Sequence, residues 1–115
     1  MALLKDLKTN GGAELAYWRL GGVFPRPAYK ECIIYLMGYE TQQDRIDFPM
    51  QFAPKEYSMS DHKEPGADGA PVDVNDYSQW FSPAALEASG NNIYEQAFAY
   101  LRSLPEFAGS IDVLD

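Results

Sequence analysis

The sequence has little of the chemistry on which catalytic and metal sites usually depend. Its 115 residues include one cysteine, Cys32, and one histidine, His62. A single cysteine excludes an internal disulfide and cannot form a zinc site by itself. Cys32 lies in an apolar run, so we expect a buried thiol and not a nucleophile, which would need a neighbouring base.

Basic residues are also scarce. Nine lysines and arginines stand against 17 acids, for a net charge of −8, which argues against nucleic-acid binding. Residues 1–55 hold six acids and seven bases, whereas residues 56–115 hold eleven acids and two bases. This asymmetry favours either head-to-tail contacts between copies or an acidic stretch that aids solubility. No segment is as long and apolar as a membrane span or a signal peptide, so we expect synthesis in a cytoplasm without export.

Catalytic motifs are missing as well. Ser60, Asp61 and His62 are contiguous, but a catalytic triad needs a rigid scaffold and an oxyanion hole. The glycine pairs at 11–12 and 21–22 are isolated and do not form a phosphate-binding loop. We therefore predict a protein that is not an enzyme and has no catalytic, cofactor or metal site.

A long polar stretch over residues 58–79 is rich in acids, glycine and proline. Its possible Ca²⁺ ligands are Asp61, Glu64, Asp68, Asp73, Asn75 and Asp76. Their spacing does not match an EF-hand, so a solvated acidic loop is expected. Trp80 and Phe81 follow the loop and serve either as a sugar-stacking platform or as an anchor that holds the loop on the core.

The sequence is rich in apolar and aromatic residues, which indicates a folded core in one domain. Hydrophobic residues make up 46% of the chain, and eight tyrosines are present. Tyrosines at this frequency fit subunit interfaces and small β-containing cores equally well. A stripe of apolar residues in the last third predicts an amphipathic helix: Ile93, Ala97, Tyr100, Leu101 and Leu104.

Three segments have the character of strands: 13–23, 29–40 and 48–57. Prolines 25 and 27 separate the first two, which suggests an antiparallel pair. The run from Cys32 to Met37 is apolar at successive positions, so both of its faces should be covered. A helix is expected on one face and a neighbouring subunit on the other.

Helix signals begin at Ser82, an N-cap that precedes a proline, and a first turn should end at Gly90. Asn92 and Glu95 have capping-box spacing at the start of the amphipathic helix. The predicted fold is therefore α+β: a small antiparallel sheet of about three strands, packed by a C-terminal amphipathic helix. Its expected parts are an arm (1–12), strands (13–57), an acidic loop (58–79), a helical region (82–104) and an extended tail (105–115).

Both ends of the chain carry motifs that resemble those of small virion proteins of tailed bacteriophages. They are Ala16-Tyr17-Trp18-Arg19-Leu20, Leu36-Met37-Gly38-Tyr39 and the segment from Tyr100 to Val113, which contains Leu104-Pro105-Glu106-Phe107-Ala108-Gly109. Residues 41–90 correspond to nothing in that pattern. The resemblance implies a structural part of the virion, made in the cytoplasm of a host bacterium and placed in the tail tip, baseplate or fibre-attachment region. Other virion proteins, and copies of the chain in a symmetric assembly, are the implied partners.

Two further functions remain open. One is binding of a host-surface glycan through Trp80 and Phe81, and the other is a head–tail connector or assembly factor. For the structural role, the expected contact residues are Tyr17, Trp18, Ile33, Tyr35, Met37, Tyr39, Phe107, Ile111, Val113 and Leu114.

Overall fold

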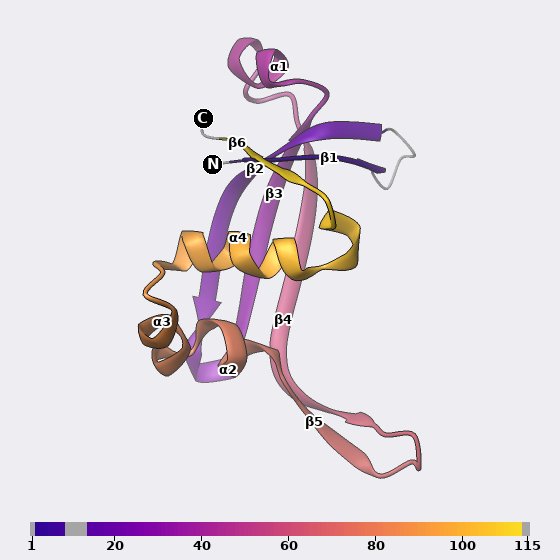
Figure 1. Cartoon of the computed structure of the whole chain (residues 1–115), viewed down its shortest axis with the longest axis vertical. Coiled ribbons are helices and arrows are strands. Elements are labelled where there is room, and N and C mark those ends of the chain that lie inside the picture. Colours follow the sequence, from indigo (N-terminus) through magenta and orange to yellow (C-terminus); the bar gives the residue numbers. More distant parts are fainter. Residues whose placement is uncertain (1, 9–13, 114–115) are drawn as a thin grey trace.

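The computed structural model describes residues 2–8 and 14–113. They form an α+β fold around a curled, half-barrel antiparallel sheet (Figure 1). The strands are β1 (Ala2–Lys8), β2 (Glu14–Arg26), β3 (Glu31–Tyr39), β4 (Ala53–Pro65), β5 (Pro71–Asn75) and β6 (Ile111–Val113). Their order across the sheet is β5-β4-β3-β2-β1-β6. The α+β class is confirmed, but the prediction of about three strands was wrong.

The additional strands come from segments in which the sequence shows no strand pattern. β1 forms from the predicted arm and pairs with β2, with Leu3 opposite Trp18. β6 forms from the predicted tail and pairs with β1, with Val113 opposite Ala2. Pairing with neighbouring strands, and not local periodicity, therefore makes both segments extended.

The predicted acidic loop is mostly a β-hairpin. β4 continues to Pro65 and pairs with β5, and the turn between them contains Gly69 at φ 83°, a conformation that suits glycine. The hairpin projects away from the rest of the sheet (Figure 1). The third predicted strand begins later than expected, at Ala53, because residues 48–52 form a loop after α1.

Four α-helices lie among the described residues: α1 (Gln42–Asp47), α2 (Asp76–Phe81), α3 (Pro83–Ser89) and α4 (Ile93–Ser103). The described residues also include two 3₁₀ turns, η1 (Pro27–Tyr29) and η2 (Pro105–Phe107). The Asn92–Glu95 capping box is present, Ser82 caps α3, and Gly90 ends it at φ 73°. These predictions are confirmed. Helix α1 was not predicted, although Thr41 caps it by accepting a hydrogen bond from the backbone N–H of Asp44.

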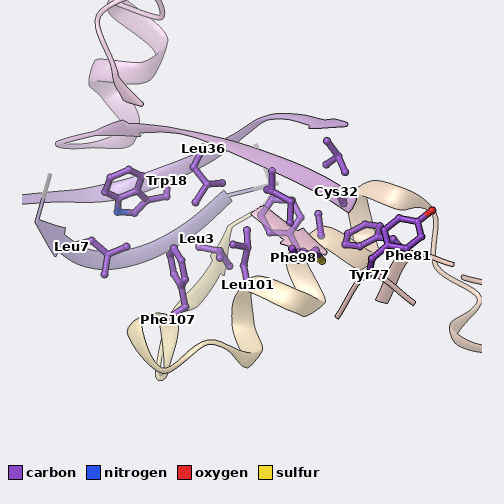
Figure 2. Close-up of a cluster of buried hydrophobic side chains, with 14 residues drawn as sticks. Leu3, Leu7, Trp18, Cys32, Leu36, Tyr77, Phe81, Phe98, Leu101 and Phe107 are labelled. Carbon is purple, nitrogen blue, oxygen red and sulfur yellow. The ribbon is translucent and has the colours of Figure 1, made fainter. Parts of the chain in front are cut away.

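Helix α4 lies across one face of the sheet, which we call the inner face (Figure 1). The core fills the space between them, and Figure 2 shows Leu101, Phe98 and Phe107 among the side chains of this layer. Trp18 is fully buried there, and its indole N–H donates to the carbonyls of Lys5 (3.1 Å) and Leu15 (3.2 Å). The sheet contributes Leu3, Leu7, Trp18, Val23, Cys32, Ile34, Leu36 and Met59 to the same core.

Cys32 is a buried free thiol, as predicted. Its burial raises the thiol pKa to about 11, well above the ordinary value of 9.0. The thiol therefore stays protonated at neutral pH, which suppresses the thiolate that a nucleophile needs.

Candidate functional site

The opposite face of the sheet, which we call the outer face, is the candidate functional surface. Side chains alternate along β3, so Cys32, Ile34 and Leu36 enter the core while Ile33, Tyr35 and Met37 point the other way. The Cys32–Met37 segment is thus apolar towards both sides of the sheet. A helix covers the inner side, whereas Tyr35 remains 37% exposed on the outer side.

Aromatic side chains from two strands and a loop gather on this face. Phe24 on β2 lies against Tyr35 on β3, with ring centroids 5.4 Å apart and an edge-on arrangement. Phe24 is 52% exposed and Phe52 is 37% exposed. With Gly21, Met37 and Pro54, these rings line a shallow apolar cavity of about 300 Å³. Exposed aromatic side chains around an apolar hollow are typical of protein contact surfaces.

Phe24 and Phe52 were not among the predicted contact residues. The irregularity between Leu20 and Gly22 shifts the register of β2, and this shift brings Phe24 opposite Ile33 on the outer face. The glycines at 21 and 22 were the available signal, since an isolated glycine in a strand often marks a bulge. Phe52 lies in the loop before β4, where the sequence alone does not indicate towards which face of the sheet the side chain points.

Four of the predicted contact residues are buried by the chain itself. Trp18 and Phe107 belong to the core beneath the inner face and are at most 1% exposed. Tyr17 and Tyr39 lie on the outer face but pack edge-on at 6.3 Å and are at most 2% exposed. In this conformation none of the four presents a surface to a partner, because intramolecular packing already covers them.

The loop after α1 closes one end of the outer face. The hydroxyl of Tyr39 donates to the carbonyl of Pro49 at 2.6 Å, and its ring packs against Phe52. A larger cavity of about 610 Å³ lies between this loop and the end of β3, where Phe48 and Met50 are among its lining residues. Met50 is 84% exposed, so the loop adds apolar surface next to the outer face.

The other predicted contact residues are accessible or fall outside the description. Ile33 and Met37 are half-buried, and Ile111 on β6 is 63% exposed. The backbone of Val113 pairs with Ala2, but its side chain lies outside what the structure describes, as does Leu114.

The Trp80–Phe81 pair anchors α2 and does not form a platform. Phe81 is 2% exposed and belongs to the core. Trp80 is half-buried and packs edge-on against Tyr100 at 5.6 Å, and its carbonyl accepts a hydrogen bond from Gln96 at 2.7 Å. Of the two interpretations, this geometry favours the anchor, because Phe81 is buried in the core and Trp80 packs edge-on against Tyr100.

Ser60, His62 and Glu64 lie in a row along β4, an arrangement that superficially resembles a catalytic triad. His62 Nδ1 is 3.1 Å from the Ser60 hydroxyl, and its Nε2 is 2.7 Å from the Glu64 carboxylate. However, Nδ1 also lies 3.0 Å from the Ser60 carbonyl, which accepts only when Nδ1 carries a proton. Both contacts favour the imidazolium and raise the pKa of His62, with the Glu64 contact dominant. When Nδ1 carries the proton it cannot take one from Ser60, and the three side chains lie in a row on one exposed strand, without the rigid enclosure that a catalytic triad needs.

Two of the acids considered as Ca²⁺ ligands, Asp61 and Asp68, accept hydrogen bonds from neighbouring residues. Asp61 accepts hydrogen bonds from the backbone N–H and hydroxyl of Ser78, which lowers the pKa of its carboxyl. Asp68 accepts from the backbone N–H of Ala70 within the hairpin turn. No group of three or more potential metal ligands was found in the parts of the chain at 2–8 and 14–113. Among the same residues, each helix is too short or too polar to span a bilayer.

No protein-family model matches the chain, and searches of curated proteins and of solved structures found no match. Function is therefore inferred from the surfaces of the molecule and from the sequence motifs at its two ends.

Proposed function

We propose that the chain is a non-enzymatic structural subunit that works through contacts on the outer face of its sheet. The observation that carries this proposal is the exposed apolar cluster of Phe24, Tyr35, Met37 and Phe52 on the face that no helix of the described residues covers. An aromatic cluster on a small acidic protein gains stability when a partner removes it from water.

The motifs shared with small virion proteins of tailed bacteriophages suggest where such a subunit works. The proposed location is the tail tip, baseplate or fibre-attachment region, after synthesis in the bacterial cytoplasm. Neighbouring virion proteins, and further copies of the chain in a symmetric assembly, are the proposed partners. No observation favours the glycan-binding alternative, because Phe81 is buried and Trp80 is packed against Tyr100.

The test is incorporation into virions by a Phe24→Asp, Met37→Glu double variant. Charges on the outer face should deplete the chain from purified particles. Because Phe24 is 52% exposed but Met37 is half-buried against Tyr17 and Tyr39, circular dichroism first checks that the double variant is folded. Mass spectrometry of the particles measures this depletion. Ile46→Asp on α1 is the matched control, since Ile46 is 55% exposed and lies away from the cluster.

Two results would contradict the proposal. Normal incorporation of the double variant would show that the outer face makes no required contact. Absence of the wild-type chain from particles whose formation depends on it would instead indicate an assembly factor.

A further inference from the structure

Strand β4 has a second edge that is open along part of its length. On one side it pairs with β3 from Ala53 to Ser60. On the other side β5 covers only Asp61 to Pro65. Within residues 2–8 and 14–113, no strand pairs with the β5 side of β4 between Ala53 and Ser60.

The hydrogen-bond pattern shows which backbone groups face this open edge. The N–H of Asp61 donates to the carbonyl of Lys30 at 2.9 Å, so these two residues form a hydrogen-bonded pair. The register between β3 and β4 then continues without a shift. In an antiparallel ladder, hydrogen-bonded pairs alternate with non-hydrogen-bonded pairs. Counting back from Asp61, Ser58 and Glu56 both fall at non-hydrogen-bonded positions, so their backbone N–H and C=O groups point away from β3. Pro54 also lies at a non-hydrogen-bonded position, so its missing N–H removes no hydrogen bond between β4 and β3.

The length of the available edge is defined by its two ends. Pro54 has no N–H to offer, so donors begin at Glu56. At the other end, the carbonyl of Ser60 already contacts the His62 ring at 3.0 Å. Glu56 and Ser58 therefore provide two N–H groups and two carbonyls in a row, the pattern with which an extended peptide pairs.

A cavity of about 500 Å³ runs along the same edge. Tyr35 and Glu56 line it from the outer face, whereas Lys55, Tyr57 and Glu106 line it from the inner face. The hydroxyl of Tyr57 is buried beside the Glu106 carboxylate, an acceptor that lies just outside strict hydrogen-bond geometry. Burial and the nearby Glu106 carboxylate raise the pKa of this hydroxyl, so it remains a donor at neutral pH. Tyr57 and Glu106 therefore close the inner side of this cavity next to the open strand edge.

The charges at the edge indicate the chemistry of the partner. Lys55 forms an ion pair with Glu106 at 3.5 Å, whereas Glu56 has no ion-pair partner in the described part of the chain. A second copy paired with β4 about a two-fold axis near Tyr57 would bring two Glu56 and two Glu106 carboxylates together. Because like charges in a cross-strand arrangement are destabilising, a basic segment fits this edge better.

From these observations we propose that the β4 edge at Glu56–Ser58 binds an extended, lysine- or arginine-containing segment of a different protein by strand addition. The segment pairs with the backbone of Glu56 and Ser58, places a basic side chain near the Glu56 carboxylate, and covers Tyr57. Tyr35 and Pro54 border both this site and the outer-face cavity. The backbone of Glu56 and Ser58, which provides the pairing groups, belongs to this site alone.

The test uses two short labelled peptides, one of alternating lysine and valine and one of alternating glutamate and valine. Fluorescence anisotropy with the full chain measures affinity, and NMR amide shifts locate binding. The lysine peptide should bind and shift the Glu56 and Ser58 amides. Glu56→Lys should weaken its binding about tenfold, whereas the matched charge reversal Glu87→Lys on α3 should change it little.

Ser58→Pro removes an outward N–H without breaking a bond to β3, and it should abolish peptide binding. Equal affinity for both peptides, or shifts confined to the outer face, would overturn the proposal. So would concentration-dependent self-association that Ser58→Pro abolishes, because the occupant would then be a second copy. Incorporation of the outer-face variant into virions is measured separately, so the two proposals can fail independently.

Discussion

The two faces of the sheet carry similar apolar residues but differ in how far these residues are exposed to solvent. On the inner face, Ile34 and Leu36 pack beneath α4 and are at most 1% exposed. On the outer face, the adjacent Tyr35 and the nearby Phe24 remain accessible to water. The contrast shows that an apolar strand alone does not specify a core, because burial depends on which element the rest of the chain supplies to cover each face.

The largest difference in stability is expected between two variants in which a phenylalanine is replaced by alanine. Phe98→Ala should lower the free energy of unfolding by about 3–5 kcal/mol, because Phe98 fills the space between α4 and the inner face and is 1% exposed. Phe24→Ala on the outer face should cost about 1 kcal/mol or less, since much of its ring already contacts water. Urea denaturation monitored by circular dichroism measures both. Equal losses would show that the outer face is as well packed as the inner one.

A second contrast uses two glycines with similar crowding. A Cβ at Gly38 would lie 2.5 Å from the Trp18 ring, which is buried, and a Cβ at Gly22 would lie 2.6 Å from the Phe24 ring, which is half-exposed. Gly38→Ala should cost about 1–3 kcal/mol because Trp18 has no space to move into. Gly22→Ala should cost less, because the Phe24 ring can rotate into solvent. Thermal unfolding of the two variants tests this, and a larger loss for Gly22→Ala would contradict it.

The smallest expected effect is the change of stability with pH that comes from Cys32 on the inner face. Burial raises the pKa of the Cys32 thiol from its ordinary value of 9.0 to about 11, so the unfolded chain loses this proton at lower pH than the folded chain. The resulting stability is fully present below pH 9.0 and is lost as pH rises towards about 11. Cys32→Ala should flatten this decline, which is measured by urea denaturation at several alkaline pH values.

Part of the alkaline slope should remain in Cys32→Ala, because the burial of Tyr57 also raises the pKa of its hydroxyl. Phe24→Ala serves as the control, since it carries no titrating group and should leave the slope unchanged. A slope unaffected by Cys32→Ala would mean that the thiol contacts water in the folded chain.

Local signals in the sequence predicted the elements that local interactions determine. The Asn92–Glu95 capping box, the Ser82 cap and the Gly90 stop all appear because each involves residues within one turn. Strands β1, β5 and β6 were missed because their pairing partners are distant or their composition is typical of loops. The hairpin segment from Pro65 to Asn75 carries the acids, glycines and prolines of a loop, yet backbone pairing makes much of it a strand.

The candidate surface was predicted only in part. Apolar residues at successive positions predicted two covered faces for the Cys32–Met37 run, and the structure places Ile33, Tyr35 and Met37 on the face opposite α4. The same reasoning could not separate Tyr17 and Tyr39 from them, because packing between two tyrosines of different strands depends on register. The open edge at Glu56 was not predictable either, because it depends on where β5 stops covering β4.

The pairing of β6 with β1 also has a consequence for biosynthesis. Ala2 and Val113 are partners although nearly the whole described chain separates them. During translation, β1 therefore emerges well before β6, and its β6-facing edge stays unpaired until β6 leaves the ribosome. Closing this long loop has a high entropic cost and only a few residues of β6 to offset it, so the β1–β6 contact should form late in folding.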